Sequence, residues 1–222
     1  MKISNSTIAI LKNFTKISKD MKFNESNVIK ISDESSTIFA TAKLEDSFTH
    51  EFCVADLPQF VSLLTLDKDN ADITIDDNYV YIKSFGGKSV IKYRTVDEEA
   101  IIVPPIDEID LSGVISTFVL DKESLDRILK TASILNCSLI SVSSDGGEVF
   151  IECYAPQKQG RAMHRDKISL GEGDGKSFRT VVDVDKMIMV SGSYETKVMD
   201  GSVYFRNIDI PIEYWICESD EF

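Results

Sequence analysis

Basic residues are scarce in this chain of 222 residues, which has 24 Lys and Arg against 37 Asp and Glu and a formal net charge of −13 at pH 7. This balance excludes a protein that coats nucleic acid through bulk positive charge, so any contact with DNA must come from a local basic surface. Long apolar runs are also missing. The longest, residues 100–106, includes two prolines, and we expect no segment to span a bilayer. The apolar stretch at residues 8–11 is too short for the core of a signal peptide.

Cysteine and histidine are rare as well, with four and two residues. No two cysteines have zinc-finger spacing, and a chain of this length needs no disulfide, so we expect reduced, buried thiols in a cytosolic protein: Cys53, Cys137, Cys153 and Cys217. His50 and Cys53 would face opposite sides of a strand, and His164 is expected in a loop. The sequence therefore predicts no metal site and no catalytic triad.

Two Gly-Lys-Ser tripeptides, at residues 87–89 and 175–177, invite comparison with a phosphate-binding loop. Such a loop needs a glycine five residues before its Gly-Lys-Ser, where this chain has Ile82 and Leu170. Acidic residues beside the second tripeptide would also repel phosphates. We therefore predict two hairpin turns and no cofactor.

The chain contains an internal repeat of about 120 residues. Four short segments of the first half recur in the same order in the second half. The pairs are Ala9–Lys12 with Arg127–Lys130, Val54–Leu57 with Val181–Val184, Val80–Ile82 with Val203–Phe205, and Ile91–Tyr93 with Ile212–Tyr214. Because each match is short, it is the shared order that indicates a duplicated domain.

Residue periodicity predicts similar elements in both halves. In the first half, helices are expected at residues 6–18 and from a cap at Asp56 to about 66, with strands at 28–32, 37–44, 48–54, 71–75, 80–85 and 89–95. In the second half we expect a strand at 114–120, a helix at 122–135, a hairpin around 145–147, a loop at 154–165, a short helix from Asp183 to about 190, and a final hairpin turned at 200–201.

These elements predict an α+β fold with two tandem similar domains, each with two helices packed on antiparallel sheets. The domains are expected at residues 1–95 and 114–222. Residues 96–113 include Pro104 and Pro105, lack periodicity, and are predicted to be the interdomain linker.

A local concentration of positive charge lies at the start of the chain. The first nineteen residues include Lys2, Lys12, Lys16 and Lys19 and no acid. On a helix, the last three of these fall within roughly 60° of one another and opposite the apolar face. Two interpretations remain open: a solvated helix face, or a surface that faces DNA.

The chain resembles the sliding clamps of T-even-type bacteriophages. The resemblance rests on Leu11-Lys12-Asn13-Phe14, on Asp56-Leu57 with Phe60, on the turn from Leu170-Gly171 to Asp174-Gly175, and on an acidic end closed by Phe222. Length, duplication and acidity also agree. The resemblance extends from end to end, and its motifs are specific only in combination.

The resemblance implies a non-catalytic DNA polymerase processivity factor with the DNA clamp fold. Three subunits would close a ring around duplex DNA, with helices lining the hole and sheets outside. An ATP-driven clamp loader would load the ring, and a hydrophobic pocket near the linker would bind the polymerase. A role in late transcription and a location in the cytoplasm of the infected host cell are implied as well.

On this interpretation, seven basic residues are expected to face DNA: Lys2, Lys12, Lys16, Lys19, Arg127, Lys130 and Lys186. The pocket wall is expected to include Val103, Pro104 and Ile106, with Phe222 nearby. The alternative interpretation of this apolar segment is packing across the domain boundary. Residues 89–94 and 162–169 are the candidate sheet edges for ring closure.

Two other classes of protein compete with this interpretation. A non-enzymatic, β-rich viral structural or interaction protein would also be acidic and duplicated, but it would have no need to concentrate lysine on one helix. An enzyme is disfavoured because the sequence offers no nucleophile with a base and no metal cluster.

Overall fold

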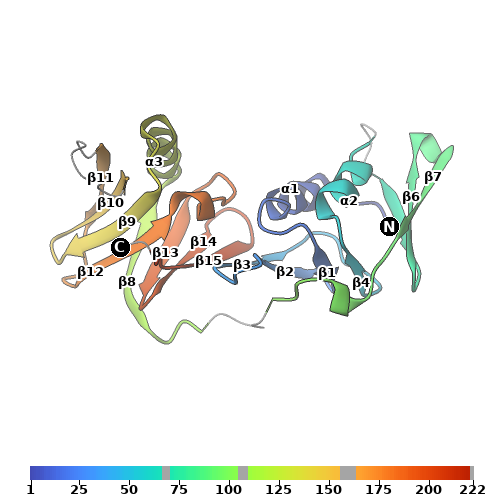
Figure 1. The fold of residues 1–222 in the computed structure, drawn as a ribbon, viewed down its shortest axis with the longest axis horizontal. Coiled ribbons are helices and arrows are strands. Elements are labelled where there is room, and N and C mark those ends of the chain that lie inside the picture. Colours follow the sequence, from blue (N-terminus) through green and yellow to red (C-terminus); the bar gives the residue numbers. More distant parts are fainter. Residues whose placement is uncertain (67–70, 105–109, 156–163, 221–222) are drawn as a thin grey trace. The chain divides into compact units, whose positions relative to one another are not determined.

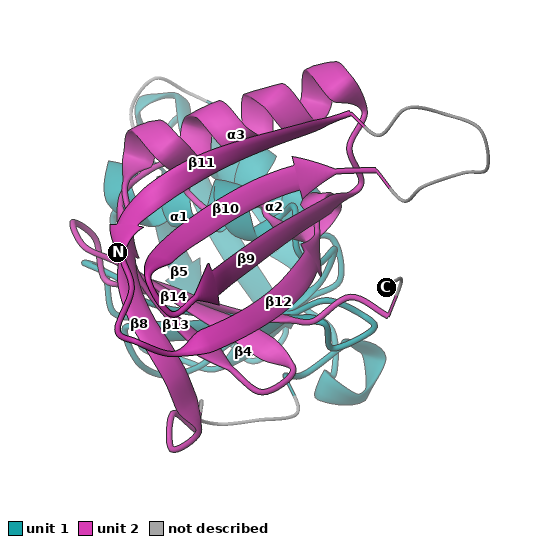
Figure 2. Ribbon diagram, turned by 90° about the vertical axis from the view of Figure 1, so that its left-hand side faces the viewer, with its two compact units in different colours: residues 1–107 teal, residues 108–222 magenta. Residues whose placement is uncertain are grey.

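The computed structural model describes residues 1–66, 71–104, 110–155 and 164–220. The chain divides into two compact units, residues 1–107 and 108–222, drawn in teal and magenta in Figure 2. The division falls within the segment predicted to be the linker. Both units are α+β with antiparallel strand pairs, which confirms the predicted fold class.

Unit 1 begins with a helix and ends with a three-stranded meander (Figure 1). β1 pairs with β4, β2 pairs with β3, and β6 lies between β5 and β7. The elements are α1 (Asn5–Phe14), β1 (Met21–Phe23), β2 (Val28–Ser32), β3 (Ile38–Lys43), β4 (Phe52–Val54), α2 (Leu57–Leu64), β5 (Asp72–Ile75), β6 (Tyr79–Ser84), the 3-10 turn η1 (Phe85–Gly87), β7 (Ser89–Arg94) and η2 (Glu98–Ala100).

Aromatic side chains fill the core of unit 1. The ring of Phe23 on β1 stacks on that of Phe52 on β4, with centroids 4.5 Å apart. Phe60 of α2 lies 5.8 Å from Phe23 and 5.2 Å from Tyr93 of β7. α2 therefore packs against the inner side of the β5–β6–β7 sheet, which leaves the other side of that sheet to solvent.

Unit 2 has a four-stranded sheet in the order β11-β10-β9-β12 and a second set of strands in the order β8-β13-β14-β15. α3 packs against β10 and β11 (Figure 2). The elements are β8 (Val114–Leu120), α3 (Lys122–Leu135), β9 (Leu139–Asp145), β10 (Glu148–Tyr154), β11 (Arg165–Glu172), β12 (Ser177–Asp183), η3 (Val184–Lys186), β13 (Tyr194–Met199), β14 (Ser202–Asn207) and β15 (Ile212–Cys217).

The two units repeat one topology. α1 corresponds to α3, the pair β1–β4 to β9–β12, β2–β3 to β10–β11, and the meander β5–β6–β7 to β13–β14–β15. Even the pairing of β8 with β13 has a counterpart, an isolated bridge between Lys2 and Asp72. All four sequence matches fall on corresponding elements, which confirms the predicted duplication.

Two predicted helix starts are confirmed by their caps. The carboxylate of Asp56 accepts a hydrogen bond from the backbone N–H of Gln59 at 2.8 Å, and α2 begins at the next residue. Asp121 accepts from the N–H of Ser124 at 2.9 Å, and α3 spans the predicted residues 122–135. In both cases the cap residue satisfies backbone donors that the helix itself leaves unpaired.

α1 ends four residues before its predicted end. Thr15 is its C-cap, and the N–H groups of Lys16 and Ile17 bond to carbonyls only three residues back, at 3.0 and 2.9 Å. The hydroxyl of Thr15 also donates to the carbonyl of Lys12 at 2.8 Å. This hydroxyl competes with backbone N–H groups for a helical carbonyl, and the chain tightens into a turn there.

The predicted second helix of unit 2 is wrong, because η3 is a single 3-10 turn of three residues. Asp183 does not cap it; its carboxylate instead accepts a hydrogen bond from the hydroxyl of Ser219 at 2.8 Å. The N–H of Val190 is bonded to the hydroxyl of Tyr214 at 3.2 Å, so the segment serves tertiary contacts in place of a helical ladder.

The predicted hairpin at residues 171–177 is also wrong. β11 and β12 lie at opposite edges of the same sheet, and the intervening residues cross the end of the β9–β10 hairpin. There the N–H of Gly173 donates to the carbonyl of Gly147 at 2.9 Å. The other Gly-Lys-Ser tripeptide does lie in a hairpin, between β6 and β7.

Candidate nucleic-acid interface and partner pocket

The basic face of α1 is produced by the packing of its apolar side. Ile10, Leu11 and Phe14 are buried in unit 1, so the opposite side of the helix is exposed. Lys12 lies there, in the last helical turn, where a cation is also favoured by the helix dipole. Lys16 is exposed in the turn that follows. Neither lysine forms an ion pair with a carboxylate of the described residues.

The other two amino-terminal lysines lie off this helix. Lys19 is exposed beyond the turn that closes α1. Lys2 is exposed at the bridge to Asp72, so it belongs to the β5 edge of the meander. The predicted set of four therefore separates into Lys12 and Lys16 at the end of α1, Lys19 in the following segment, and Lys2 on a sheet.

The exposed face of α3 is mixed in charge. Arg127 and Lys130 are exposed, as a DNA-facing role would need, but the Nε atom of Arg127 lies 3.9 Å from a carboxylate oxygen of Asp166. Lys122 forms an ion pair with Asp126 one turn along the helix. Lys186 is half-exposed in η3. α2 carries no basic residue, so α1 presents the least compensated positive charge of the three described helices.

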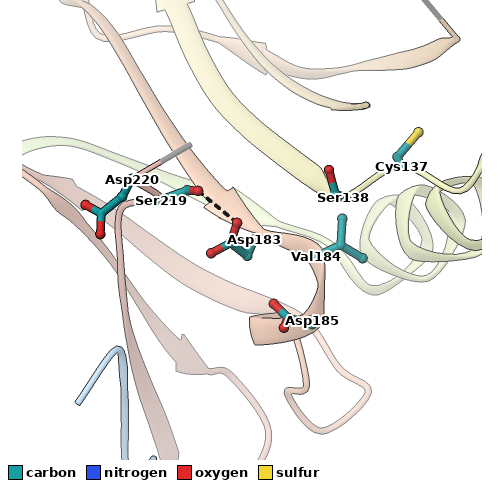
Figure 3. Close-up of a pocket in the computed structure, with 7 residues that line it drawn as sticks. All are labelled: Cys137, Ser138, Asp183, Val184, Asp185, Ser219 and Asp220. Atoms are coloured by element: carbon teal, nitrogen blue, oxygen red, sulfur yellow. Dashed lines mark hydrogen bonds between the residues drawn. The ribbon is translucent and has the colours of Figure 1, made fainter. Parts of the chain in front are cut away.

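A cavity of about 640 Å³ opens in unit 2 beside the carboxyl-terminal segment (Figure 3). Its lining residues come from the end of α3, the end of β12, η3 and the carboxyl-terminal segment: Cys137, Ser138, Asp183, Val184, Asp185, Ser219 and Asp220. Burial, with the neighbouring Cys153 thiol contributing, raises the pKa of the Cys137 thiol to about 11. A thiol held in its neutral form is a poor nucleophile.

The carboxyl-terminal segment forms one wall of this cavity because it is tied to β12. The N–H of Ser219 donates to the carbonyl of Val181 at 2.8 Å, and the N–H of Val181 donates to the carboxylate of Glu218 at 3.3 Å. Figure 3 shows the hydroxyl of Ser219 bonded to Asp183 across the same edge. Sequence periodicity could not reveal this wall, because the contact joins residues almost forty positions apart.

The predicted pocket residues are only partly described. Val103 is exposed and Pro104 is half-exposed, while Ile106 and Phe222 lie outside the described residues. The linker leaves unit 1 from an anchored point: the N–H of Ile102 donates to the carboxylate of Asp20 at 3.1 Å. Of the two described ones, neither Val103 nor Pro104 lines the cavity of unit 2.

Two edge strands, β7 in unit 1 and β11 in unit 2, are the open strands considered for ring closure, and β8 and β12 are edge strands too. Within the described part of each unit, β7 pairs only with β6, and β11 pairs only with β10. Inward-facing apolar residues on these strands remain half-exposed: Ile91 and Tyr93 on β7, Ile168 and Leu170 on β11. The predicted edge at residues 89–94 is β7 itself. Of the predicted edge at 162–169, residues 162 and 163 lie outside the described residues and 165–169 belong to β11.

Neither a metal site nor a membrane helix is found in the described part of the chain. No three His, Cys, Asp or Glu side chains gather there in a way that could hold a metal ion. Of the helices described, none combines the length and apolar character that a transbilayer span requires.

No family model matches the chain, but individual phage proteins do. The sliding clamp of Vibrio phage KVP40 is 29% identical over 221 residues, which cover 98% of both chains. The chain is similar to phage sliding clamps over most of its length. The sliding clamp of Escherichia phage RB69 is 27% identical over 201 residues, which cover 88% of this chain and 86% of the relative.

Solved structures agree on the architecture of this chain. The beta clamp of Helicobacter pylori, in complex with 5-chloroisatin, has a TM-score of 0.72 at 12% identity; the match covers 99% of this chain and 65% of that longer one. The proliferating cellular nuclear antigen of Entamoeba histolytica has a TM-score of 0.68 at 12% identity, with 96% and 95% covered. At such identities the likeness shows the fold alone, and it confirms the predicted DNA clamp fold.

Proposed function

We propose that this chain is a sliding clamp, a non-catalytic ring that encircles duplex DNA without sequence preference and tethers a replicative DNA polymerase. The observation that carries the proposal is the relation to phage sliding clamps over nearly the whole chain. The working ring would have three subunits, the number that the resemblance to T-even clamps implies. It would act in the cytoplasm of the infected host cell.

Ring closure would use the two open strands. β7 of one subunit would pair with β11 of the next, a head-to-tail contact that repeats around a closed ring. The half-exposed apolar residues behind these strands favour this arrangement, because a neighbouring strand and the layer beneath it would bury them. Pairing would also remove two edges that would otherwise invite aggregation.

DNA contact would come mainly from Lys12 and Lys16, with Lys19, Arg127, Lys130 and Lys186 in supporting positions. Contacts from lysine to phosphate carry no sequence information and weaken as salt rises, which suits a protein that must slide. Loading by an ATP-driven clamp loader and a part in late transcription complete the proposal, both on the resemblance to the T-even clamps.

A topological assay tests the proposal. The protein, loaded by its clamp loader with ATP onto nicked circular DNA, should co-elute with that DNA in gel filtration, and cutting the circle once should release it. Sedimentation of the free protein should give three times the chain mass of 24.8 kDa at high concentration. If the chain were a β-rich structural protein, cutting the DNA circle would not change its retention. Equal retention on linear and circular DNA would refute the clamp proposal.

The cavity of unit 2 is our proposed docking site for a partner's short peptide. The linker residues Val103, Pro104 and Ile106 and the terminal Phe222 are proposed separately as contacts of the polymerase. A large side chain in the cavity should block a peptide without touching the open strands. We expect Val184→Arg to lower polymerase stimulation at least tenfold while ring mass is unchanged. Thr117→Arg, at an exposed position of β8 outside the cavity, is the control. Normal stimulation by the Val184 variant would place the site elsewhere.

A further inference from the structure

Positive charge also gathers on the outer face of the β5–β6–β7 sheet, away from α1. Tyr93 of β7 points inward to α2. Because side chains alternate along a strand, Lys92 and Arg94 of β7 point outward, and so do their cross-strand partners on β6, Tyr81 and Tyr79. Five basic residues share this outer face or the tip of the hairpin, and all are exposed: Lys2, Lys83, Lys88, Lys92 and Arg94. Figure 1 shows no other element of unit 1 beyond this sheet.

The acidic residues of the sheet compensate this charge only in part, because Asp72 attracts Lys2 and Lys83 through space and Asp76 attracts Lys92. Asp72 forms an ion pair with the amino terminus at 2.9 Å, and Asp76 accepts hydrogen bonds from two backbone N–H groups of its own turn. Both belong to β5 or to the turn after it, whereas four of the five basic residues lie on the β6–β7 hairpin. None of these five side chains forms an ion pair with a carboxylate of the described residues. In a chain of net charge −13, such a surface is exceptional.

Aromatic rings alternate with these basic side chains. Tyr79 and Tyr81 lie on the outer face with centroids 6.3 Å apart, and the Nζ atom of Lys92 sits 3.7 Å from the centroid of Tyr79. At the tip, Phe85 is 66% exposed, with Lys88 Nζ 5.5 Å from its ring centroid. Its φ of 52° is in the left-handed region, which a bulky residue rarely adopts. The tip of the hairpin thus presents an aromatic ring and a cation together at the surface.

We infer that this outer face binds single-stranded nucleic acid. Alternate residues on a strand are about 6.6 Å apart, a spacing that lets successive side chains follow an extended polyanion. Exposed rings between cations are the arrangement by which sheets hold unpaired bases without sequence preference. Lys83, Lys92 and Arg94 would contact phosphates, and Phe85 would stack on a base. The surface is separate from α1, so the inference goes beyond the encircling of duplex DNA.

Anisotropy of a dye-labelled oligothymidylate of twenty nucleotides tests the inference. We expect Lys83→Glu with Lys92→Glu to weaken binding at least tenfold and to flatten the slope of log affinity against log salt by about 1.4, the value for two lost phosphate contacts. Phe85→Ala should weaken binding roughly fivefold or more, and Phe85→Trp should restore it.

The matched control is Lys12→Glu with Lys16→Glu, which changes the net charge equally within the same unit. It should keep the binding of the oligonucleotide, whereas the outer-face pair should keep retention on nicked circular DNA. Failure of the inference and failure of the clamp proposal are thereby distinguishable. An equal loss of oligonucleotide affinity in both double variants would place the oligonucleotide inside the ring and overturn the inference. The inference would also be overturned if the unmodified protein bound a polyglutamate peptide and did not bind the oligonucleotide, because the partner would then be an acidic protein.

Discussion

Replacing Ile91 with Asp is expected to leave a folded chain that no longer forms rings. Ile91 faces inward on β7 and is half-exposed, so the isolated chain tolerates a polar group there, whereas the assembled ring would bury it beside the next subunit. An unpaired charge buried at an interface costs about 3 kcal/mol or more, which corresponds to a weakening of each contact by more than a hundredfold. Sedimentation should then show monomers at concentrations where the unmodified protein is assembled.

Val90→Asp is the matched control, because Val90 is the adjacent residue and points outward with 57% exposure. It should assemble normally. Ile168→Asp on β11 should repeat the defect from the other side of the contact. Circular dichroism must show that the monomers are folded. Normal rings from both the Ile91 and the Ile168 variants would mean that β7 and β11 do not form the subunit contact.

Local signals in the sequence account for most of the fold. Asp121 and Asp56 identify the starts of α3 and α2, because a capping carboxylate acts on backbone groups only three residues away. The duplication was readable for the same reason: corresponding strands keep the same alternation of buried and exposed side chains. Local signals fail where a residue distant in the sequence forms the decisive contact. The hydroxyl of Ser219 donates a hydrogen bond to Asp183, and the second helix predicted for unit 2 is only the 3-10 turn η3.

The candidate site is less predictable than the fold, because a surface is assembled from separate elements. Lys12 could be placed on an exposed helical face from spacing alone, but Lys2 could not be assigned to a sheet without knowing that it pairs with Asp72. The cavity of unit 2 depends on the carboxyl-terminal segment lying along β12. The outer basic face depends on strand register, which sets Lys92 beside Tyr81 and Arg94 beside Tyr79.

Changing Lys12 and Lys16 to Glu is expected to abolish stable retention on circular DNA without affecting assembly. Both side chains point away from the core, so the free energy of unfolding should change by no more than about 0.5 kcal/mol. Each subunit would present two negative charges to the phosphates in place of two positive ones. In a ring of three, six favourable contacts would become repulsive, and processive synthesis should fall at least tenfold at moderate salt.

Changing Lys12 and Lys16 to Gln removes the attraction without adding repulsion. Retention of this variant on circular DNA should therefore lie between that of the unmodified ring and that of the Glu pair. Each lost contact with duplex DNA should flatten the salt dependence of loading by about 0.9. The Lys83→Glu, Lys92→Glu protein is the control of equal charge, and it should be retained as the unmodified ring is. The effect should be the same on DNA of any sequence, because only phosphates are contacted. If the Glu pair supports normal synthesis with rings intact, α1 does not face the DNA and its lysines form only a solvated helix surface.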